Sequence, residues 1–491
     1  MSTRLVNVDR QTPMMFPPDL RDWVRPEDLV HFVVEAVELL PLVKFRLNRR
    51  GSGSEQYPPK MMLSLLIYCY STGTFSSRAI EELTYSHISV RYLCANTHPD
   101  HDTINRFRKD NKALLEETFV KVLELARELK LVKMGTVAID GTKIAANASK
   151  HSAVSYGRAG EIVERLKGEV QELLLKAEEA DRVPLQVGLS IPEEMARRED
   201  RKKKLEEARA AIEARVKEEA KAKQAAYEAK VAERQLKRQR DGSVRGREPQ
   251  PPSSEPAAKE QYNFTDPESR IMKAGNGQHF EQAYNAQAAV DVESMLVMGQ
   301  HVSDAPNDKE QLQPTVESIP ASLGKPEKVI VDAGFFNGPQ IEAVEGPRKE
   351  QTEKSDDNDG PQGPGVAVEE PAQEEATEPV TTVYAAVGRI EHDRPLAEYE
   401  ARSDPAAPPP EAPLVDRMRH RLSTAEGKAV YKVRKHTVEP VFGIIKHVIG
   451  FRRFSLRGRE KVGLEWTLVC LAWNMKRLHT LGMGAKMAKA A

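Results

Sequence analysis

The chain has 491 residues, of which 30% are charged and only 6% are aromatic. This length accommodates about two to four domains, and the high charge indicates long stretches of solvated helix or linker. The three cysteines, Cys69, Cys94 and Cys470, are far apart and have no histidine at zinc spacing. They exclude a disulfide scaffold and favour buried free thiols in a reducing compartment.

The sequence contains no pattern typical of export or of a membrane span. Arg4, Asp9 and Arg10 interrupt any apolar run at the start of the chain. The most apolar stretch, residues 61–70, is shorter than the roughly 20 residues that a helix needs to cross a bilayer. We therefore expect a soluble, cytoplasmic protein that does not contact a membrane.

The net charge of −1 conceals two blocks of opposite sign. Residues 417–461 hold 13 lysines and arginines against 3 acidic residues, whereas residues 349–378 hold 10 acidic residues against 2 lysines. The basic block is a candidate surface for binding nucleic-acid phosphates. The acidic block is also rich in proline, glycine and glutamine, which predicts disorder.

Residues 26–133 read as a series of short helices joined by short turns. Pro26 and the acids that follow it suit the first turn of a helix, and Pro58 and Pro59 precede another. Two interpretations are open for this part of the chain. It is either a helix-turn-helix-like DNA-binding unit or a helical domain with ordinary solvated charges, and the basic side chains that the first interpretation would use are Arg78, Arg91, Arg106, Arg108 and Lys109.

A long charged region, residues 159–240, has apolar residues at steps of three and four. A break rich in proline and glycine falls at residues 181–190, and Ser190 with Glu193 forms a capping box for a second helix. This pattern predicts two antiparallel helices, a coiled-coil hairpin inserted into the rest of the fold. The stripe of apolar residues is a packing seam and not a binding site.

The remaining segments alternate between strands and helices. An apolar strand at residues 136–139 ends at Asp140, and another at residues 328–331 ends at Asp332. Residues 278–303 predict two strands joined by a turn at Glu293 and Ser294, and residues 381–388 predict a fifth strand. Helices are expected at residues 309–318, 337–345 and 460–481. The order predicts a mixed α/β sheet flanked by helices, with an N-terminal all-helical domain and an inserted helical hairpin.

These segments define the expected domain boundaries. We expect an N-terminal helical domain, an α/β domain in four pieces, the hairpin, three linkers or insertions and a tail. In chain order they are 1–133 (helical domain), 134–158 (first α/β piece), 159–240 (hairpin), 241–261 (linker), 262–346 (second α/β piece), 347–380 (acidic, disordered insertion), 381–400 (strand of the α/β domain), 401–415 (proline-rich linker), 416–482 (C-terminal helices of the α/β domain) and 483–491 (tail).

Three acidic residues form the candidate site. Asp140 and Asp332 stand at strand ends, and Glu439 lies within the basic block. Converging carboxylates of this kind can hold two divalent cations that promote phosphoryl transfer. In the proposed arrangement Asp140 bridges both metals, Asp332 binds one, and Glu439 binds the other and orients water. The alternative for each aspartate is an Asx turn with the glycine that follows it, Gly141 or Gly334.

The same segments resemble a known family. The blocks IDGTKIAANAS, QAYNAQAAVD, VIVDAGFFNG and VEPVFGIIKHVIGFRRFSLRGREKVGLEWTLVCLAWNMKRL are similar to successive blocks of bacterial insertion-sequence transposases, which carry a DDE triad on an RNase H-like fold. The N-terminal blocks PPKMMLSLLIYCYSTGTFSSRAIEE and HDTINRFR resemble the helical domain of the same family. Together these blocks cover most of the chain outside the hairpin and the linkers.

The resemblance implies an activity and a set of residues for it. It implies Asp140, Asp332 and Glu439 as catalytic and metal-binding residues, with two Mg²⁺ ions for which Mn²⁺ can substitute. It implies binding to the terminal inverted repeats of the element, nicking that exposes a 3′-hydroxyl, attack on target DNA, a working homodimer and association with the nucleoid. The family pattern also has Tyr, Arg and Lys near the glutamate, and here either Arg434 or Lys435 fills the arginine position. The residues expected to bind DNA are Tyr431, Arg434, Lys435, Lys446, Arg452, Arg453, Arg106 and Arg108.

Three other functions compete with this interpretation. An RNase H-like nuclease would cut DNA without joining it to a target. An inactive or domesticated copy would bind DNA without cutting it, although all three acids are present. A coiled-coil scaffold would rest on residues 159–240 alone and would leave the strand-end aspartates unexplained.

Overall fold

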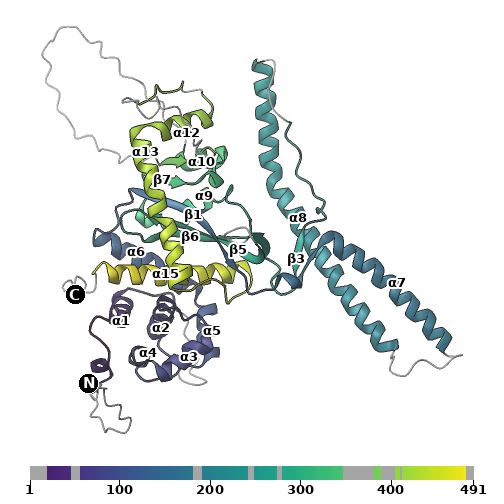
Figure 1. The fold of residues 1–491 in the computed structure, drawn as a ribbon, viewed down its shortest axis with the longest axis horizontal. Coiled ribbons are helices and arrows are strands. Elements are labelled where there is room, and N and C mark those ends of the chain that lie inside the picture. Colours follow the sequence, from purple (N-terminus) through teal and green to yellow (C-terminus); the bar gives the residue numbers. More distant parts are fainter. Residues whose placement is uncertain are drawn as a thin grey trace, which may run out of the picture. The chain divides into compact units, whose positions relative to one another are not determined.

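The computed structural model describes residues 19–45, 56–180, 191–241, 248–273, 279–346, 381–388, 404–409 and 412–482. The chain divides into two compact units (Figure 1). The first comprises Met1–Ile144, Asn285–Leu456 and Glu460–Ala491, and the second comprises Ala145–Tyr284 and Arg457–Arg459. The residues expected to form the acidic, disordered insertion, 347–380, and those expected to form the tail, 483–491, lie outside the described residues.

In the described part of residues 1–133, seven helical segments precede the sheet, as the N-terminal pattern predicts. Asp28 and Asp100 cap the second and sixth of them, because their carboxylates accept hydrogen bonds from the main-chain N–H groups of Val30 and Thr103. Cys69 and Cys94 are buried free thiols in this region, and Cys470 is a third one in the last helix. The segments are η1 (Leu20–Trp23), α1 (Leu29–Leu39), α2 (Pro59–Ser71), α3 (Ser77–Ser86), α4 (Ile88–Leu93), α5 (His101–Asp110) and α6 (Lys112–Glu128).

Among the described residues, six strands form a mixed sheet. Its strands follow the order β4–β5–β1–β7–β8, and β6 also pairs with β5. The pairs β1–β7 and β7–β8 are parallel, whereas β4 and β6 run antiparallel to successive parts of β5. The strands are β1 (Thr136–Ala145), β4 (Arg270–Lys273), β5 (Phe280–Asp291), β6 (Val297–Ser303), β7 (Lys328–Val331) and β8 (Thr382–Ala385).

The strand that carries Asp140 is longer than the sequence indicates. The pattern predicts that it ends at Ile139, but β1 continues through Asp140 and Gly141 to Ala145. The neighbouring strand β5 explains the extension. Main-chain hydrogen bonds from Val292 N to Thr136 O and from Ala146 N to Gln282 O show that β5 lies antiparallel along the whole of β1. Asp140 therefore lies within a strand and not at its end.

Three helices that the sequence predicts after β6 are present in the structure. The expected helices at 309–318, 337–345 and 460–481 correspond to α9, α10 and α15, of which α9 is the shortest because only residues 312–317 are α-helical. The segments after β6 are α9 (Leu312–Glu317), η3 (Ala321–Leu323), η4 (Ala333–Phe335), α10 (Gly338–Glu345), α12 (Leu414–Ser423), α13 (Ala425–Lys432), η5 (Val433–His436), α14 (Val438–Gly443), the π-helical turn η6 (Ile444–Val448) and α15 (Arg459–Thr480).

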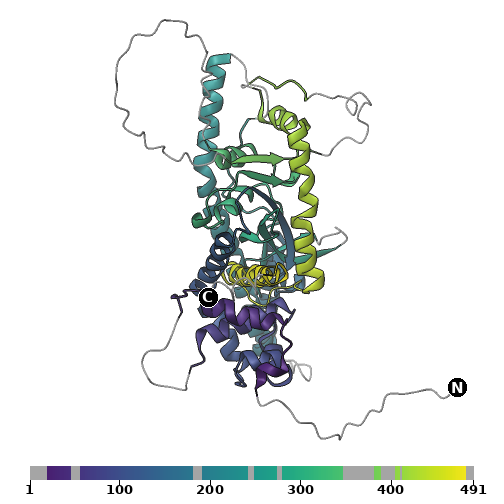
Figure 2. The same ribbon diagram turned by 90° about the vertical axis from the view of Figure 1, so that its left-hand side faces the viewer.

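The last helix, α15, lies between the sheet and the N-terminal helices (Figures 1 and 2). Toward the sheet, Trp466 donates its indole N–H to the carbonyl of Gln287 on β5. Toward the N-terminal helices, Ser71 donates from its hydroxyl to the carbonyl of Ala472. A helix covered on both faces has to be apolar nearly all round, which explains its run of buried side chains from Leu464 to Met475.

A buried charged network joins α15 to the N-terminal helices. The carboxylate of Glu465 is fully buried, accepts a hydrogen bond from the Tyr70 hydroxyl at 3.1 Å and lies 3.7 Å from the Arg108 guanidinium. Arg108 also donates to the Tyr70 hydroxyl at 2.6 Å. The second carboxylate oxygen of Glu465 accepts the main-chain N–H groups of Ser455 and Leu456. Burial and the adjacent carboxylate raise the pKa of Tyr70.

Arg108 is therefore a correction to the expected DNA-binding set. Its side chain is 4% exposed and its guanidinium is engaged by Tyr70, Glu465 and the carbonyl of Phe75, so it cannot reach a DNA phosphate from this position. Arg106, two residues earlier on α5, is exposed. Side chains two residues apart on a helix point in different directions, and the apolar pattern did not show that Arg108 belongs to the inner face.

The second unit consists of a small sheet and the inserted helices. The strands β2 (Ala153–Ser155) and β3 (Gln261–Asn263) pair antiparallel beside the short η2 (Lys150–Ser152). Helices α7 (Tyr156–Ala180) and α8 (Ile191–Asp241) pack antiparallel, as two hydrogen bonds show. The Tyr156 hydroxyl donates to Glu213 at 2.7 Å, and Arg198 donates to Glu169 at 3.0 Å.

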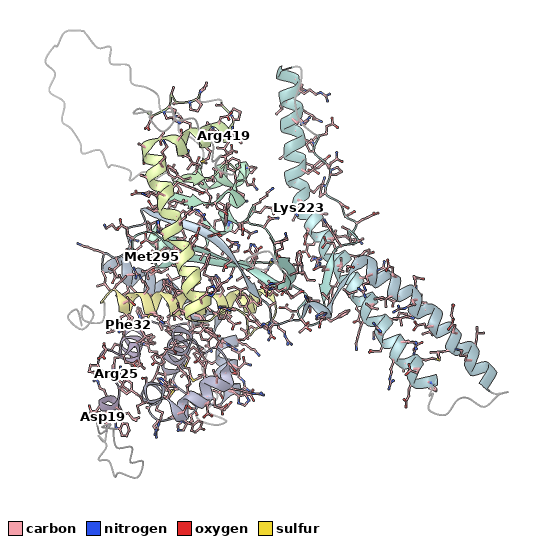
Figure 3. All side chains as sticks on the ribbon, in the orientation of Figure 1. Asp19, Arg25, Phe32, Lys223, Met295 and Arg419 are labelled. Carbon is pink, nitrogen blue, oxygen red and sulfur yellow. The ribbon has the colours of Figure 1, made fainter. Side chains whose placement is uncertain are left out.

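The expected seam of the hairpin is buried. Val163, Leu166, Leu205 and Ala208 form its core. Because α7 begins at Tyr156, opposite Glu213, the residues of α8 beyond 213 extend past the start of α7. Exposed side chains such as Lys223 project from this extension (Figure 3).

Removing the buried arginine should destabilise the protein far more than removing its exposed neighbour. We predict that Arg108→Ala lowers the free energy of unfolding by about 3–5 kcal/mol, because it leaves the Glu465 carboxylate buried without a cation. Arg106→Ala, the matched control on the same helix, should change it by less than about 0.5 kcal/mol. Thermal and urea unfolding of both variants measure the difference, and equal effects would contradict the buried network.

Candidate active site

The register of two parallel strands places the two aspartates side by side. In the pairing of β1 with β7, Thr136 lies opposite Lys328 and Ala138 opposite Ile330, a constant offset of 192 residues. The same offset places Asp140 level with Asp332. Each aspartate also accepts a local hydrogen bond of 2.8 Å, Asp140 from the N–H of Gly141 and Asp332 from the N–H of Gly334. The Asx-type contacts that the sequence allowed as alternatives thus coexist with a paired arrangement.

The surroundings of Asp140 disfavour its ionised form. Its side chain is 21% exposed. Burial, followed by the negative charge of Asp332, raises the pKa of Asp140 to about 7, although the N–H of Gly141 and the Arg434 guanidinium act in the opposite direction. A carboxylate with a strongly raised pKa beside a second carboxylate is typical of a functional site.

Arg434 links Asp140 to the third acid. Its guanidinium lies 3.8 Å from Asp140 Oδ2 and donates to Glu439 Oε1 at 3.2 Å. The short helical segments α13, η5 and α14 bring both residues to the sheet. Thr437 takes the N-cap position of α14, but its hydroxyl donates backward to the carbonyl of Val433 and does not cap the helix. Tyr431, whose pKa is raised by burial, lies beside Arg434.

Comparison with protein-family models gives two matches. Residues 200–475 match the model described as a transposase DDE domain, and residues 18–110 match the transposase domain DUF772. The first match covers 276 of 491 residues, which is more than half of the chain. The chain belongs to the DDE transposase family. The mixed sheet flanked by helices and the N-terminal helical region agree with the fold expected for such a transposase.

The two matches leave part of the transposase uncovered. Asp332 and Glu439 lie within the matched DDE domain, but residues 111–199, which include Asp140, lie outside both ranges. Asp140 is therefore connected to the other two acids by the strand register and by Arg434. Comparison with curated proteins and with solved structures found no match.

The donor atoms of the site suit a divalent cation, the kind of cofactor that DDE transposases generally use. The carboxylates of Asp140 and Asp332 are oxygen ligands of the type that Mg²⁺ prefers, and burial followed by the charge of Asp332 raises the pKa of Asp140. Across the described ranges, the positions of the side chains form no group of three or more His, Cys, Asp or Glu residues that could hold a metal. In this arrangement the Arg434 guanidinium lies between Asp140 and Glu439.

The other expected DNA-binding residues lie on neighbouring segments. Lys446 donates from Nζ to the main-chain carbonyl of Lys143 on β1 at 2.7 Å, so it reaches the strand of Asp140 directly. Arg452 and Arg453 are exposed, and Arg452 donates to the carbonyl of Lys446. Lys435 is exposed, whereas Arg434 contacts both acids.

Sequence reasoning missed a polar group behind Asp140. Asn285 and Gln287 are fully buried on β5, and both donate to the carboxylate of Asp308 at 2.7 Å. The signal was present in the sequence, since two amide side chains at i and i+2 stand within an otherwise apolar strand.

Among the described residues, no helix is both long enough and apolar enough to cross a membrane.

Replacing Asp140 with asparagine should stabilise the metal-free protein in a pH-dependent way. The pKa of Asp140 rises from 3.8 in the unfolded chain to about 7 in the folded one, so its destabilising effect is absent below the first value and complete above the second. We predict that the advantage of Asp140→Asn in unfolding free energy grows by about 1 kcal/mol per pH unit between pH 4 and pH 7. It should stay constant above pH 7.

The measurement is chemical unfolding of both proteins in EDTA across this pH range. Glu342→Gln, at an exposed acid on α10, is the control and should show no such trend. A constant difference between Asp140→Asn and the wild type at all pH values would contradict the raised pKa.

Proposed function

We propose that the protein is an active insertion-sequence transposase that binds terminal inverted repeats, cuts at them and joins the exposed 3′-hydroxyl to target DNA. The observation that carries this proposal is the geometry of three acids: Asp140 is level with Asp332, and Arg434 connects Asp140 to Glu439. The presence of all three acids, with the half-buried Asp140 beside Asp332 and a cation between Asp140 and Glu439, favours an active enzyme over an inactive copy.

Asp140 and Asp332 would hold one divalent cation between them, and Glu439 would complete the site for a second, with Mg²⁺ as the ion and Mn²⁺ as a substitute. Bound cations of this kind activate the attacking oxygen of water or of a 3′-hydroxyl and stabilise the leaving oxygen. Asp140 has to be ionised to act as a ligand, so at neutral pH it gives up the proton that its surroundings favour.

The basic residues of the site would then hold the DNA strand. When the acids bind cations, the Arg434 guanidinium is released from them and can pair with a phosphate in a bidentate manner. Tyr431 packs beside Arg434 and restricts its position. Lys446, Arg452, Arg453 and the exposed Lys435 would contact phosphates on either side, and Arg106 would do so from the N-terminal helices. Joining two element ends requires two active sites, so a homodimer is the expected working form.

Removing either of two acids should abolish catalysis without abolishing DNA binding. We predict that Asp332→Ala and Glu439→Ala eliminate Mg²⁺-dependent cleavage and strand transfer, because each change removes a ligand and leaves the DNA-contacting cations in place. The assay incubates purified protein with a labelled duplex that carries the DNA flanking its gene, in Mg²⁺ or in EDTA. Binding is followed separately by a mobility shift.

The matched control for these variants is Glu342→Ala, which removes an exposed acid on α10 and should keep full activity. Cleavage by Asp332→Ala at the wild-type rate would contradict the proposed site. Cleavage by the wild type without any joined product would indicate a nuclease, and binding without cleavage would indicate an inactive copy.

Metal binding can distinguish between Arg434 and Lys435, the two candidate basic residues near Glu439. We predict that Arg434→Gln raises the affinity of the DNA-free protein for Mn²⁺ about tenfold, because the change removes a positive charge 3.8 Å from Asp140 and 3.2 Å from Glu439. Lys435→Gln, one residue along, should leave that affinity nearly unchanged. Calorimetric titration with Mn²⁺ measures both, and equal effects would show that Arg434 has no special place in the site.

A further inference from the structure

A buried polar cluster lies against the residue that follows Asp140. Asp308 Oδ1 accepts hydrogen bonds from Asn285 Nδ2 and from Gln287 Nε2, each at 2.7 Å. Asp308 Oδ2 lies 3.9 Å from the ammonium of Lys143 on β1. Asn285 and Gln287 are both fully buried, which is costly for amide side chains unless their polar atoms are engaged. Asn285, Gln287 and Asp308 are called the amide–carboxylate cluster below.

The register of β1 against β5 places this cluster directly opposite Gly141. The hydrogen bonds of Val292 to Thr136 and of Ala146 to Gln282 show that paired residue numbers add up to 428. Gly141 therefore faces Gln287, and Lys143 faces Asn285. Because neighbouring residues of a strand point to opposite faces, the cluster lies on the face opposite to the Asp140 side chain.

The cluster occupies the space that a side chain at position 141 would need. A Cβ built on Gly141 would lie less than 3.0 Å from Gln287 Nε2, Asp308 Oδ1 and Asn285 Oδ1, closer than real Cβ contacts. A Cβ at position 141 would therefore displace the ends of these side chains, which are buried at Gln287 and Asn285 and held by the same carboxylate oxygen. Glycine at position 141 lets the cluster contact the backbone without a side chain between them.

The backbone next to Asp140 depends on this contact, because the pairing of β1 with β7 covers only Thr136 to Ala138. Asp140 and Gly141 lie beyond the last paired residue on that side. On the other side they are supported by β5, which carries Asn285 and Gln287, and by Asp308, which follows β6 and holds both amides. A shift of the backbone at Gly141 would carry the Asp140 carboxylate with it.

We propose that Asp308, through the amides of Asn285 and Gln287, is the positioning residue for the carboxylate of Asp140. This inference rests on the proposed role of Asp140 in catalysis. Asp308 acts as a hydrogen-bond acceptor that locks both amides against Gly141, and Lys143 balances its charge. The cluster fixes where Asp140 stands relative to Asp332, and it does not itself touch DNA.

Asp308 is not placed as a further metal ligand. Its Oδ1 already accepts two N–H donors, and its Oδ2 faces the ammonium of Lys143. A positioning acceptor and a metal ligand respond differently to substitution. Asparagine keeps an acceptor oxygen in the same place, but it removes the charge that a metal ligand needs.

The first test uses Gly141→Ala with Gly135→Ala as its matched control. A Cβ at Gly135, one residue before β1, meets no atom within 4 Å, so this control should keep the wild-type rate. We expect Gly141→Ala to reduce the rate of strand transfer about 100-fold, since a displacement of about 1 Å at a catalytic group has an effect of this size. The affinity for the terminal-repeat duplex should change less than about threefold, because the DNA contacts are elsewhere.

The second test compares Asp308→Ala with Asp308→Asn and does not depend on whether Gly141→Ala folds. Asp308→Ala should lose as much rate as Gly141→Ala, whereas Asp308→Asn should recover to within about tenfold of the wild type. The electron paramagnetic resonance spectrum of Mn²⁺ bound to the DNA-free protein gives a readout other than activity. It should broaden in Asp308→Ala and return to the wild-type form in Asp308→Asn.

Asp140→Ala, measured in the same series, tests the catalytic role of Asp140 separately from the positioning role of Asp308. If Asp140→Ala retains cleavage, the proposed function of Asp140 is wrong. If Asp140→Ala is inactive while Asp308→Ala and Gly141→Ala transfer strands at the wild-type rate, only the positioning role is overturned. Equal loss in Asp308→Asn and Asp308→Ala would overturn it in favour of a charged role for Asp308.

Discussion

The site depends on one constraint: it costs free energy to hold the carboxylates of Asp140 and Asp332 side by side in a half-buried position. Asp140 on β1 is level with Asp332, which directly follows the parallel strand β7, and burial followed by the negative charge of Asp332 raises the pKa of Asp140 to about 7. In the metal-free protein the Arg434 guanidinium lies near both Asp140 and Glu439, and its positive charge offsets part of this cost. A site that favours cations so strongly is suited to divalent metals, and it also makes the position of every nearby positive charge important.

Several elements hold the backbone next to Asp140 in place. The segment that follows Asp140 is no longer paired with β7, so the strand β5 and the amide–carboxylate cluster hold it. On the far side of β5, the Trp466 indole donates to the carbonyl of Gln287. One residue, Gln287, thus receives support from α15 through its backbone and contacts Gly141 through its side chain. The precision of the carboxylates depends on this stack of α15, β5 and β1.

The helix α15 extends the same support to the N-terminal helices. Glu465 accepts hydrogen bonds from the main-chain N–H groups of Ser455 and Leu456, shortly after the exposed Arg452 and Arg453, and it is paired with Arg108 and Tyr70. A basic surface segment is thereby fixed to a buried ion pair. The N-terminal helices and the strands β6, β7 and β8 belong to the same compact unit.

Much of the local structure could be predicted from the sequence. The two aspartate strands, the paired strands around Glu293 and the helical hairpin all follow from apolar spacing and turn residues. These features depend on neighbours within a few residues, where periodicity is informative. The adjacency of Asp140 and Asp332 also followed, because neighbouring strands of one sheet bring their residues together.

Other features could be decided only by tertiary structure. The sequence ended the first strand at Ile139, whereas pairing with β5 extends it to Ala145. Arg106 and Arg108 looked alike, but only Arg108 meets a buried carboxylate from a helix more than 350 residues later. Arg434 and Lys435 were equal candidates from the sequence. In the structure both belong to η5, where Arg434 lies near Asp140 and Lys435 is exposed. By itself the sequence determined most of the helices, the two aspartate strands and the strands around Glu293, but not β2, β3 or β4, and it determined which acids could form the site. The environment of each charge depends on partners that are distant in sequence, so only the folded chain decided it.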